Sequence, residues 1–337
     1  MSHSPQNPAA DTTMSALVQH SLDGPRDLRL EQIPVPSPQS GEYLVRVGAA
    51  GVNFADVMQT YGTYVGGPTP PYTAGFEAAG EIVGVGAGVT SPLPMGTHVV
   101  GTGPGAFGQF MTMPSDEVIP VPSGWSDAEA LGMILNWATA LGALRTVGRV
   151  QKGETVLILA AAGGVGRAAI RLARHYGATV VAAASASKHA ELAAAGADII
   201  IDSRRPDLAA EVMQRTGGVD LVLESVGGAT FSASMSVAKP FSGRVVVFGY
   251  SSGDTSLTTR QLVFEHHAQV MGLHIGALAR HAPQDYARLI AELETLIVDD
   301  VYVPGNPVLH PLADGAVVLE QVGSGMTTGK HGLDPWR

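Results

Sequence analysis

Two patterns of apolar and polar positions divide the chain near residue 134. Before that point, short apolar runs are separated by glycine and proline, which is typical of strands joined by tight turns. The clearest predicted strands are residues 16–19, 43–49, 78–85 and 98–101. The first part of the chain is therefore predicted to be a β-rich, barrel-like domain.

From residue 155 onward, predicted strands alternate with predicted helices. Residues 155–160 form a continuous apolar run, as expected of a strand that is buried on both faces. Such alternation predicts a parallel sheet with helical crossovers. The predicted strands are 155–160, 179–184, 199–201, 219–224, 243–248 and 269–273, and the predicted helices are 166–176, 188–195, 207–214 and 229–238.

The length of 337 residues fits two domains, at roughly 150 residues each. We predict an α/β protein in which residues 1–13 form a disordered tail, 14–135 the β-rich domain and 136–274 the domain with a doubly wound parallel sheet. Residues 275–337 contain one further predicted helix, at 285–296, and are expected to return to the first domain.

A glycine-rich turn, Ala161-Ala162-Gly163-Gly164-Val165-Gly166, follows the first strand of the predicted sheet. It fits a variant of the dinucleotide-binding fingerprint and stands between a predicted strand and a predicted helix, as the fingerprint requires. Gly163 would let the backbone approach a pyrophosphate, and Gly166 would let the helix pack close to the strand. The helix N-terminus would face the negative charge. Ala161, Gly163, Gly164, Val165 and Gly166 are thus candidate cofactor-binding residues, with an ordinary tight turn as the alternative.

The end of the next strand indicates NADPH rather than NADH. Enzymes that use NAD usually carry an acidic residue about 20 residues after the glycines, which would repel the 2′-phosphate of NADPH. No acidic residue lies between Thr179 and Lys188. Ser185 and Lys188 can contact that phosphate, and Arg204 can reach it from the end of the following strand. The alternative for Lys188 is an ordinary solvated lysine at a helix start.

Composition and charge exclude several functions. The net charge of −10, from 20 Lys and Arg against 30 Asp and Glu, disfavours nucleic acid and anionic membranes as partners. The absence of cysteine excludes disulfides, thiolate-bound zinc and iron–sulfur clusters. The polar residues 1–13 do not form a signal peptide, and no apolar stretch reaches the ~20 residues of a membrane span. We expect a cytoplasmic protein.

Three further motifs carry a family resemblance. They are Gly51-Val52-Asn53-Phe54-Ala55-Asp56, Gly62-Thr63-Tyr64 and Gly75-Phe76-Glu77-Ala78-Ala79-Gly80. With these motifs and the glycine-rich turn, the chain from Met14 to about Lys330 resembles the zinc-independent quinone oxidoreductase branch of the medium-chain dehydrogenase/reductase superfamily, which includes enoyl reductases. Lys188 and Ile201-Asp202-Ser203-Arg204 resemble the enoyl reductases of polyketide synthases in particular.

The resemblance implies a GroES-like substrate domain, a Rossmann domain that binds NADPH, a cleft between them and a homodimer formed by pairing of the last sheet strand. In zinc-dependent relatives a cysteine stands where this chain has Asn53, and a His-Glu pair stands where it has Phe76-Glu77. The resemblance therefore implies that no metal is bound. Glu77 would then be a buried structural carboxylate.

Tyr64 and Asn53 are the candidate catalytic residues. Without a metal, a hydrogen-bond donor has to stabilise the negative charge that hydride delivery builds on the substrate oxygen. In some related enoyl reductases a tyrosine at the matching Gly-x-Tyr position is the proposed proton donor, which points to Tyr64. Asn53 would hydrogen-bond the substrate or the nicotinamide ribose. The alternatives are that Tyr64 only covers the floor of the cleft and that Asn53 stabilises a turn.

Gly249, Tyr250 and Ser251 follow a predicted strand, and the resemblance places them against the nicotinamide. With Ser252 and Gly253 they also match the G-x-S-x-G nucleophile elbow of serine hydrolases. That elbow needs a helix directly after the serine, whereas Gly253-Asp254-Thr255-Ser256 favours a loop. A serine hydrolase acting through Ser251 is the more remote alternative.

The sequence thus predicts an NADPH-dependent reductase that transfers hydride to a quinone or an α,β-unsaturated carbonyl. The substrate is a small molecule, either free or bound to a carrier protein, and whether it is a quinone, an enone or an enoyl thioester stays open. The main alternative is a non-catalytic protein that binds NADPH as a structural element or sensor.

Overall fold

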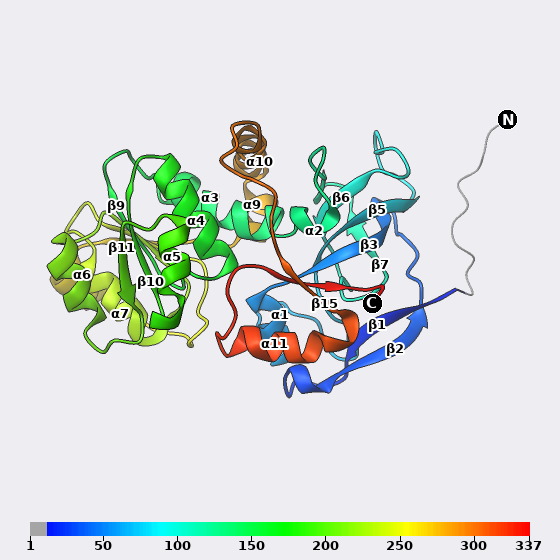
Figure 1. Cartoon of the computed structure of the whole chain (residues 1–337), viewed down its shortest axis with the longest axis horizontal. Helices are drawn as coiled ribbons and strands as arrows, with labels where there is room; N and C mark the ends of the chain where they lie inside the picture. Colours follow the sequence, from blue (N-terminus) through cyan, green and yellow to red (C-terminus); the bar gives the residue numbers. More distant parts are fainter. Residues whose placement is uncertain (1–11) are drawn as a thin grey trace. The chain divides into compact units, whose positions relative to one another are not determined.

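The computed structural model describes residues 12–337, which form two compact units (Figure 1). The first unit holds the described residues up to Ile134 together with Pro304–Arg337, and the second is Leu135–Val303. Most of the predicted tail, residues 1–11, lies outside the described residues. Thr13, which the prediction placed in the tail, belongs to the first strand.

The first unit contains two sheets. The smaller has the strand order β2-β1-β4, from β1 (Thr13–Gln19), β2 (Leu28–Pro34) and β4 (Tyr72–Thr73). The larger has the order β15-β16-β3-β5-β6-β8, with β7 paired to β3. Its strands are β3 (Glu42–Val52), β5 (Glu77–Val85), β6 (His98–Thr102), β7 (Phe110–Pro114), β8 (Val118–Pro120), β15 (Val308–Pro311) and β16 (His331–Asp334).

Alternating apolar positions of these strands build the core of the first unit. Tyr43, Val45 and Val47 of β3 are fully buried with Phe107 and Leu333. Two helices, α1 (Phe54–Thr60) and α11 (Gly315–Gly323), lie side by side against this core (Figure 1). Because α11, β15 and β16 all come from the end of the chain, the first unit needs both ends of the sequence.

The second unit is a parallel sheet with the order β11-β10-β9-β12-β13-β14. Helices α4 and α5 cover one face and α6 and α7 the other, as Figure 1 shows. This is the doubly wound arrangement that the sequence predicted. The strands are β9 (Thr155–Ile158), β10 (Thr179–Ala184), β11 (Ile199–Asp202), β12 (Leu221–Glu224), β13 (Arg244–Val247) and β14 (Gln269–Gly272), and the helices are α4 (Gly164–His175), α5 (His189–Ala195), α6 (Leu208–Thr216) and α7 (Gly228–Val237).

The order of these strands reverses between β9 and β12, which are neighbours in the sheet. In such sheets, ligands bind beside the carboxyl ends of the strands at the point of reversal. Two loops of this chain meet that condition, the glycine-rich turn after β9 and residues 225–228 after β12.

The chain returns to the first unit at Pro304, and not at residue 275 as the sequence pattern predicted. Helices α9 (Ile275–His281) and α10 (Pro283–Val298) belong to the second unit. The reason is packing: the leucines of α10 are buried, and a side chain on Gly142 would come within 3.2 Å of Leu289. An amphipathic helix buries its apolar stripe on whichever surface is complementary, and its own sequence does not specify that surface.

The stretch Asp127–Val147 is the one helical segment among the described residues that is long and apolar enough to cross a membrane. It comprises α2 (Asp127–Ala130), η2 (Met133–Trp137), α3 (Ala138–Leu141) and η3 (Gly142–Val147). Of its most apolar window, 61% is buried inside the protein, which accounts for its composition. Met133 is buried, and Trp137 stacks on buried Tyr302 with ring centroids 3.8 Å apart.

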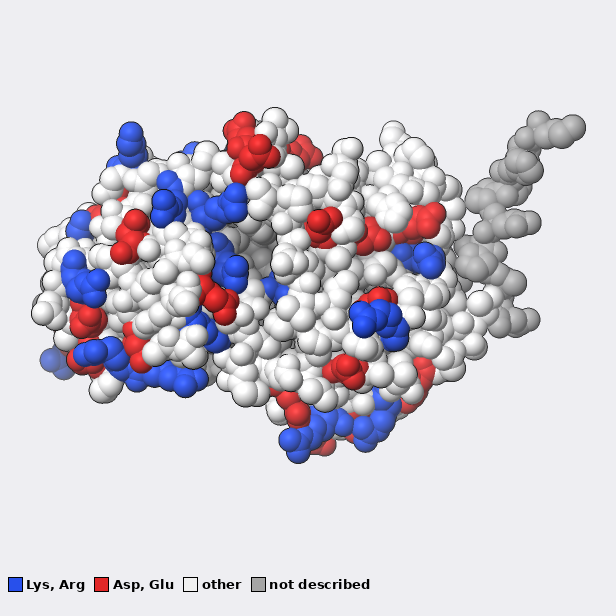
Figure 2. Space-filling model, viewed as in Figure 1, with Lys and Arg blue, Asp and Glu red and all other residues white. Residues whose placement is uncertain are grey.

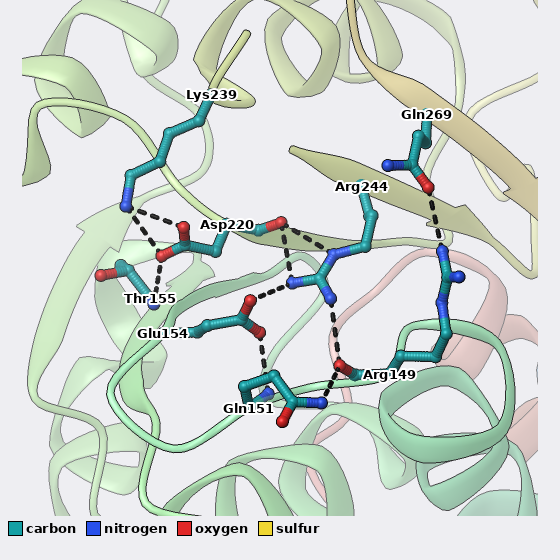
Figure 3. Close-up of polar contacts among 8 residues, drawn as sticks. All are labelled: Arg149, Gln151, Glu154, Thr155, Asp220, Lys239, Arg244 and Gln269. Carbon is teal, nitrogen blue, oxygen red and sulfur yellow. Dashed lines mark hydrogen bonds and ion pairs between the residues drawn. The ribbon is translucent and has the colours of Figure 1, made fainter. Parts of the chain in front are cut away.

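A charged network joins the amino ends of the second unit's strands (Figure 3). The buried Arg244 guanidinium donates to Glu154 Oε1 at 2.6 Å and to the carbonyl oxygens of Arg149 and Asp220. The Asp220 carboxylate in turn accepts from Lys239 Nζ at 2.8 Å and from a backbone N–H at the start of β9. These contacts lie at the edge of the sheet opposite the strands' carboxyl ends, so they serve the fold.

Candidate functional site

The glycine-rich turn after β9 has the geometry of a phosphate loop. Gly166 permits the close approach of α4 to the strand, because a Cβ there would lie 2.5 Å from the Cα of Ala161. A Cβ on Gly164 would similarly lie 2.7 Å from the Asn136 side chain. Gly166 is therefore required by packing against backbone, as the fingerprint predicts, whereas the neighbour of Gly164 is a side chain.

The N-terminus of α4 is open to an anion. Gly163 precedes the helix, no side chain caps this end, and the first turn contains no acidic residue. A Cβ on Gly163 would approach only the carbonyl oxygen of Ala160, at 3.4 Å. A helix of 12 residues that begins in this way presents backbone N–H groups and the positive end of its dipole to a ligand. The residues present thus fit a pyrophosphate.

Cationic and hydroxyl side chains gather at the carboxyl ends of β10 and β11. Ser185 directly follows β10 and lies 3.3 Å from Ser187, hydroxyl to hydroxyl, and Lys188 ends the short helix η4 (Ala186–Lys188). Burial lowers the pKa of Lys188, Glu191 opposes that shift, and the nearby positive charge of Arg204 adds to it. Two such cations could together hold a dianionic phosphate, whose negative charge would offset their repulsion.

The loop of residues 249–253 lies beside the loop after β12. The backbone N–H of Ser251 donates to the carbonyl oxygen of Ser225 at 3.1 Å, and a Cβ on Gly249 would lie 3.0 Å from that same oxygen. Tyr250 lies between them in the sequence and is partly exposed. These contacts place Gly249, Tyr250 and Ser251 at the carboxyl edge of the sheet, beside its point of strand reversal.

Glu224 fixes the position of the loop after β12, and no sequence motif marks this residue. Its carboxylate is fully buried and accepts hydrogen bonds from the backbone N–H groups of Val226, at 2.7 Å, and Gly227, at 3.0 Å. Its other oxygen accepts from the Ser234 hydroxyl at 2.5 Å. Glu224 therefore shapes both loops of this edge, because the second loop rests on the first.

The structure argues against a nucleophile elbow at Ser251. The serine lies in a turn, the following residues are irregular, and the next helix is α8 (Thr259–Gln261). The elbow requires a helix that begins directly after the serine. The serine hydrolase alternative therefore lacks its structural context.

A buried polar triad occupies the first unit. The Lys330 ammonium donates to Glu77 Oε2 at 2.5 Å and to Asn53 Oδ1 at 2.8 Å, while Asn53 Nδ2 donates to Glu77 Oε2 at 3.0 Å. Glu77 is fully buried, and its other oxygen accepts from the backbone N–H of Gly132 at 2.8 Å. A Cβ on Gly51 would lie 2.2 Å from Glu77 Oε2, so the glycine makes room for the triad.

These contacts bear on the role of Asn53. Both ends of its amide are held by Glu77 and Lys330, and its backbone N–H donates to Asp56 Oδ2 at 2.7 Å at the start of α1. The alternative role considered for Asn53, stabilising a turn, is the one that this geometry supports. Lys330 was not found from sequence because it lies 277 positions from Asn53, and no local pattern marks it.

Tyr64 lies in the loop before β4, with its ring centroid 6.5 Å from that of Phe76. Phe76 and Gly75 line a cavity of about 590 Å³ in the first unit. Tyr72 of β4 and Gln59 of α1 line the same cavity. The tyrosine proposed as donor thus stands beside a cavity of the size that binds small molecules.

Asp56 is a further buried acid that sequence analysis left without a role. Burial raises its pKa from 3.8 to about 8, although the Asn53 N–H and the charge of Lys330 oppose the shift. Burial raises the pKa of Tyr72 to about 12, and nearby Asp56 adds to that rise. Among the described residues, Asp56 Oδ1 and the Tyr72 hydroxyl are buried without a hydrogen-bond partner. A proton on Asp56 turns Oδ1 into a donor.

Comparison with known proteins agrees with this geometry. Residues 39–123 match the alcohol dehydrogenase GroES-like domain, and residues 164–295 match a domain family described as zinc-binding dehydrogenase. A probable quinone oxidoreductase from Leishmania amazonensis is 35% identical over 318 residues, covering 88% of this chain and 90% of the relative. The chain belongs to the zinc-independent quinone oxidoreductase branch of the medium-chain dehydrogenase/reductase superfamily. It is an oxidoreductase.

Two solved structures show the same fold over the whole chain. The quinone oxidoreductase of Escherichia coli, in complex with NADPH, has a TM-score of 0.88 and 28% identity, covering 95% of this chain and all of the other. The CurK enoyl reductase has a TM-score of 0.85 and 28% identity, covering 96% and 99%. The structures similar to this chain thus include both a quinone oxidoreductase and an enoyl reductase.

The family described as zinc-binding dehydrogenase matches residues 164–295, which include neither Asn53 nor Glu77. Among residues 12–337, no group of three or more His, Asp and Glu side chains is arranged to hold a metal ion. The ammonium of Lys330 lies between Asn53 and Glu77, the positions at which zinc-dependent relatives carry metal ligands. A fixed positive charge there would repel a metal cation.

Proposed function

We propose that this protein uses NADPH to reduce a conjugated carbonyl compound, either a quinone or an α,β-unsaturated carbonyl. The observation that carries the proposal is the pairing of an open helix N-terminus at α4 with the cations Lys188 and Arg204. The first fits a pyrophosphate and the second a 2′-phosphate. The similar Escherichia coli enzyme was solved with NADPH bound, which supports this cofactor.

The residues assigned to the cofactor divide into three groups along the carboxyl edge of the sheet. Gly163 and Gly164 would hold the pyrophosphate with Ala161, Val165 and Gly166 of the same turn. Ser185, Lys188 and Arg204 would hold the 2′-phosphate. Gly249, Tyr250 and Ser251 would support the nicotinamide, on a loop that Glu224 positions through residues 225–228. When bound, NADPH supplies the hydride.

In the reaction, the chain's own residues stabilise charge on the substrate oxygen. Hydride addition to the far carbon of the conjugated system leaves an enolate or phenolate oxygen, to which the Tyr64 hydroxyl donates a hydrogen bond. Either Tyr64 or water then delivers the proton. Asn53, whose amide contacts Glu77 and Lys330, helps to fix the start of α1 and stays a candidate for hydrogen-bonding the substrate or the nicotinamide ribose.

The proposal is tested by following NADPH oxidation with a panel of quinones and enones before and after exhaustive chelation of metals. We expect turnover with at least one compound of either class, unchanged by chelation. Tight NADPH binding without turnover of any compound would support the alternative of a non-catalytic binding protein. A requirement for added zinc would contradict the proposal.

The partner is proposed to be a small molecule, free or bound to a carrier protein. Acidic and basic side chains are mixed on the visible face, where no extended basic surface is seen (Figure 2). With the net charge of −10, this favours a small uncharged substrate over nucleic acid.

A homodimer is proposed from the edge of the parallel sheet. β14 is the last strand of the sheet and pairs only with β13, so its other edge presents unpaired backbone groups. Exposed apolar residues lie on and next to it, in β14 itself, in η5 (Leu262–His266) and in the loop before β13. These residues, which we call the β14 edge patch, are Phe241, Val263, Phe264 and Val270. Pairing with a second copy would cover both features.

A further inference from the structure

The cavity of about 590 Å³ extends well beyond Tyr64 and Phe76. It continues along the first unit to Met14 of β1 and Ile33 of β2, which are paired with each other in the smaller sheet. Its volume falls in the range that encloses most of a drug-sized molecule. A conjugated carbonyl group alone, held near Phe76, would leave most of this space unused.

The lining of the cavity is uncharged. Met14, Ile33, Phe76 and Phe110 line it with several prolines, and no Asp, Glu, Lys, Arg or His of the described chain is among its lining residues. Burying a phosphate or carboxylate in such surroundings would cost free energy without a compensating partner. The far part of the cavity is therefore suited to an apolar group.

The wall near Phe76 is held rigidly by the backbone. The N–H groups of Gly103 and Gly105 donate to the carbonyl oxygens of Phe76 and Gly75, both at 3.0 Å. Gly75 has a φ of +81°, and a Cβ there would lie 2.4 Å from the ring of Phe107. Hydrogen-bonded backbone thus fixes the wall of the cavity beside Phe76.

We propose that this cavity binds an apolar chain attached to the conjugated carbonyl group, so that the preferred substrates carry a long hydrocarbon tail that runs from Phe76 toward Met14 and Ile33. The inference rests on the proposed function and narrows its substrate class. Two sources share this chemistry, alkyl enones and quinones with an apolar side chain, and the experiment treats them as separate arms.

The test compares kcat/KM for straight-chain vinyl ketones whose alkyl tails run from one to ten carbons. Each buried methylene is expected to raise kcat/KM about fourfold until the cavity is full. A second arm compares a short quinone with the same quinone carrying an alkyl tail, and a rise confined to that arm would assign the cavity to quinone side chains. Equal kcat/KM for short and long tails in both arms would overturn the inference, and the reductase function would stand.

Two variants and a binding measurement sharpen the test. Ile33→Trp, which fills the far end of the cavity, should shorten the optimal tail while leaving the shortest ketone unaffected. Leu30→Trp is the matched control, because Leu30 is on the same strand but is exposed and does not line the cavity. It should change neither the optimal tail length nor the rate with the shortest ketone. Saturated ketones with the same tails, which cannot accept hydride at carbon-carbon bonds, should raise Tm in proportion to tail length. Binding that follows tail length without turnover would support the cavity and contradict the proposed function.

Discussion

Lys188 is the residue whose charge we expect to decide cofactor preference. It stands partly buried beside Arg204 at the ends of β10 and β11, where the 2′-phosphate of NADPH is proposed to bind. Removing a charge-assisted contact of this kind costs roughly tenfold or more in affinity. Lys188→Ala should therefore weaken NADPH binding by about that factor and leave NADH binding nearly unchanged.

Both dissociation constants can be measured by titrating the fluorescence of the reduced cofactors. Lys152→Ala removes an exposed lysine at the opposite edge of the sheet, before β9, and serves as the matched control. Equal losses for NADPH and NADH in Lys188→Ala would contradict the assignment.

Tyr64 offers a test of the mechanism. If its hydroxyl is the main donor to the substrate oxygen, Tyr64→Phe should lower kcat by on the order of 10²–10³ and leave NADPH affinity unchanged. If the ring only covers the cavity, the effect should be a few-fold and appear in KM. The enone reaction should suffer more than the quinone reaction, because a quinone accepts hydride with less assistance.

Steady-state kinetics of Tyr64→Phe with one enone and one quinone decide between these outcomes. Tyr72→Phe is the control, because Tyr72 also lines the cavity but its hydroxyl is buried and its pKa is raised to about 12. A large loss of kcat in Tyr72→Phe together with full activity of Tyr64→Phe would transfer the donor role to Tyr72.

Asp56 should make the stability of the protein depend on pH. Its pKa is about 8 in the folded chain and near 3.8 when unfolded, so the folded state binds more protons between those values. Stability from this group is fully present below pH 4, falls as pH rises and is lost once pH passes 8. The groups acting on Asp56 are Lys330, Glu77 and the Asn53 N–H, and none of them reverses this sign.

Asp56→Asn removes the titration and keeps a similar shape. The difference in free energy of unfolding between variant and wild type should therefore shift in favour of the variant from pH 5 to pH 8. Urea unfolding at several pH values measures this, and Asp23→Asn, at an exposed position on the surface, controls for general charge effects. Parallel curves for Asp56→Asn and the wild type would show that Asp56 is ionised throughout.

At the scale of elements, Arg244 ties the amino ends of β9, β12 and β13 together (Figure 3). The Arg244 side chain is 8% exposed and that of Glu154 is 20% exposed. Truncating Arg244 would therefore leave the largely desolvated Glu154 carboxylate without its cationic partner. Arg244→Ala should lower the free energy of unfolding by about 3 kcal/mol. NADPH affinity of the folded variant should not change, because the cofactor loops lie at the other ends of the strands.

Chemical denaturation and cofactor titration measure these two quantities independently. Arg205→Ala breaks an exposed pair with Asp207 and should have little effect on stability. A selective loss of NADPH binding in Arg244→Ala, without loss of stability, would contradict a purely structural role.

Elements differ in how well the sequence predicts them. β10 was predicted with its observed bounds, because a run of five buried residues after Thr179, between turn signals, leaves few alternatives. The return of α11, β15 and β16 to the first unit was predicted in outline, but those elements were not identified. β16 is short and pairs with β3, some 280 positions earlier, so its stability comes from the partner strand and not from its own pattern.

At the scale of the whole molecule, the β14 edge patch predicts the state of assembly. If two copies pair along β14, the protein should have the mass of a dimer at micromolar concentration. Val270→Lys places a charge on the edge strand and should shift the mass toward a monomer. Val298→Lys, at an exposed apolar position on α10 away from β14, is the control. Light scattering on the three proteins measures the mass, and a monomeric wild type would contradict the proposal.

The sequence by itself determined the features that depend on neighbours along the chain. The alternation of strands and helices specified the doubly wound sheet, and the glycine-rich turn between β9 and α4 marked the candidate phosphate loop. Gly166 is an example. Helix α4 packs closely on the strand just before it, and only a glycine fits at the contact. Because the strand and the helix are neighbours along the chain, this glycine stands at a fixed position in the motif. Lys188 became a candidate for the same reason, because it lies in the short helix η4 that follows β10.

Only the tertiary structure decided which distant residues meet. Lys330 lies between Asn53 and Glu77 because β16 pairs with β3, and that pairing brings Asn53 into a polar triad. α10 was expected in the first domain, yet its leucines are buried in the second unit. Asp56 acquires its raised pKa from burial by segments that precede and follow it. Desolvation, ion pairing and packing depend on which residues are close in space. For residues far apart along the chain, the sequence pattern does not show which ones will be close.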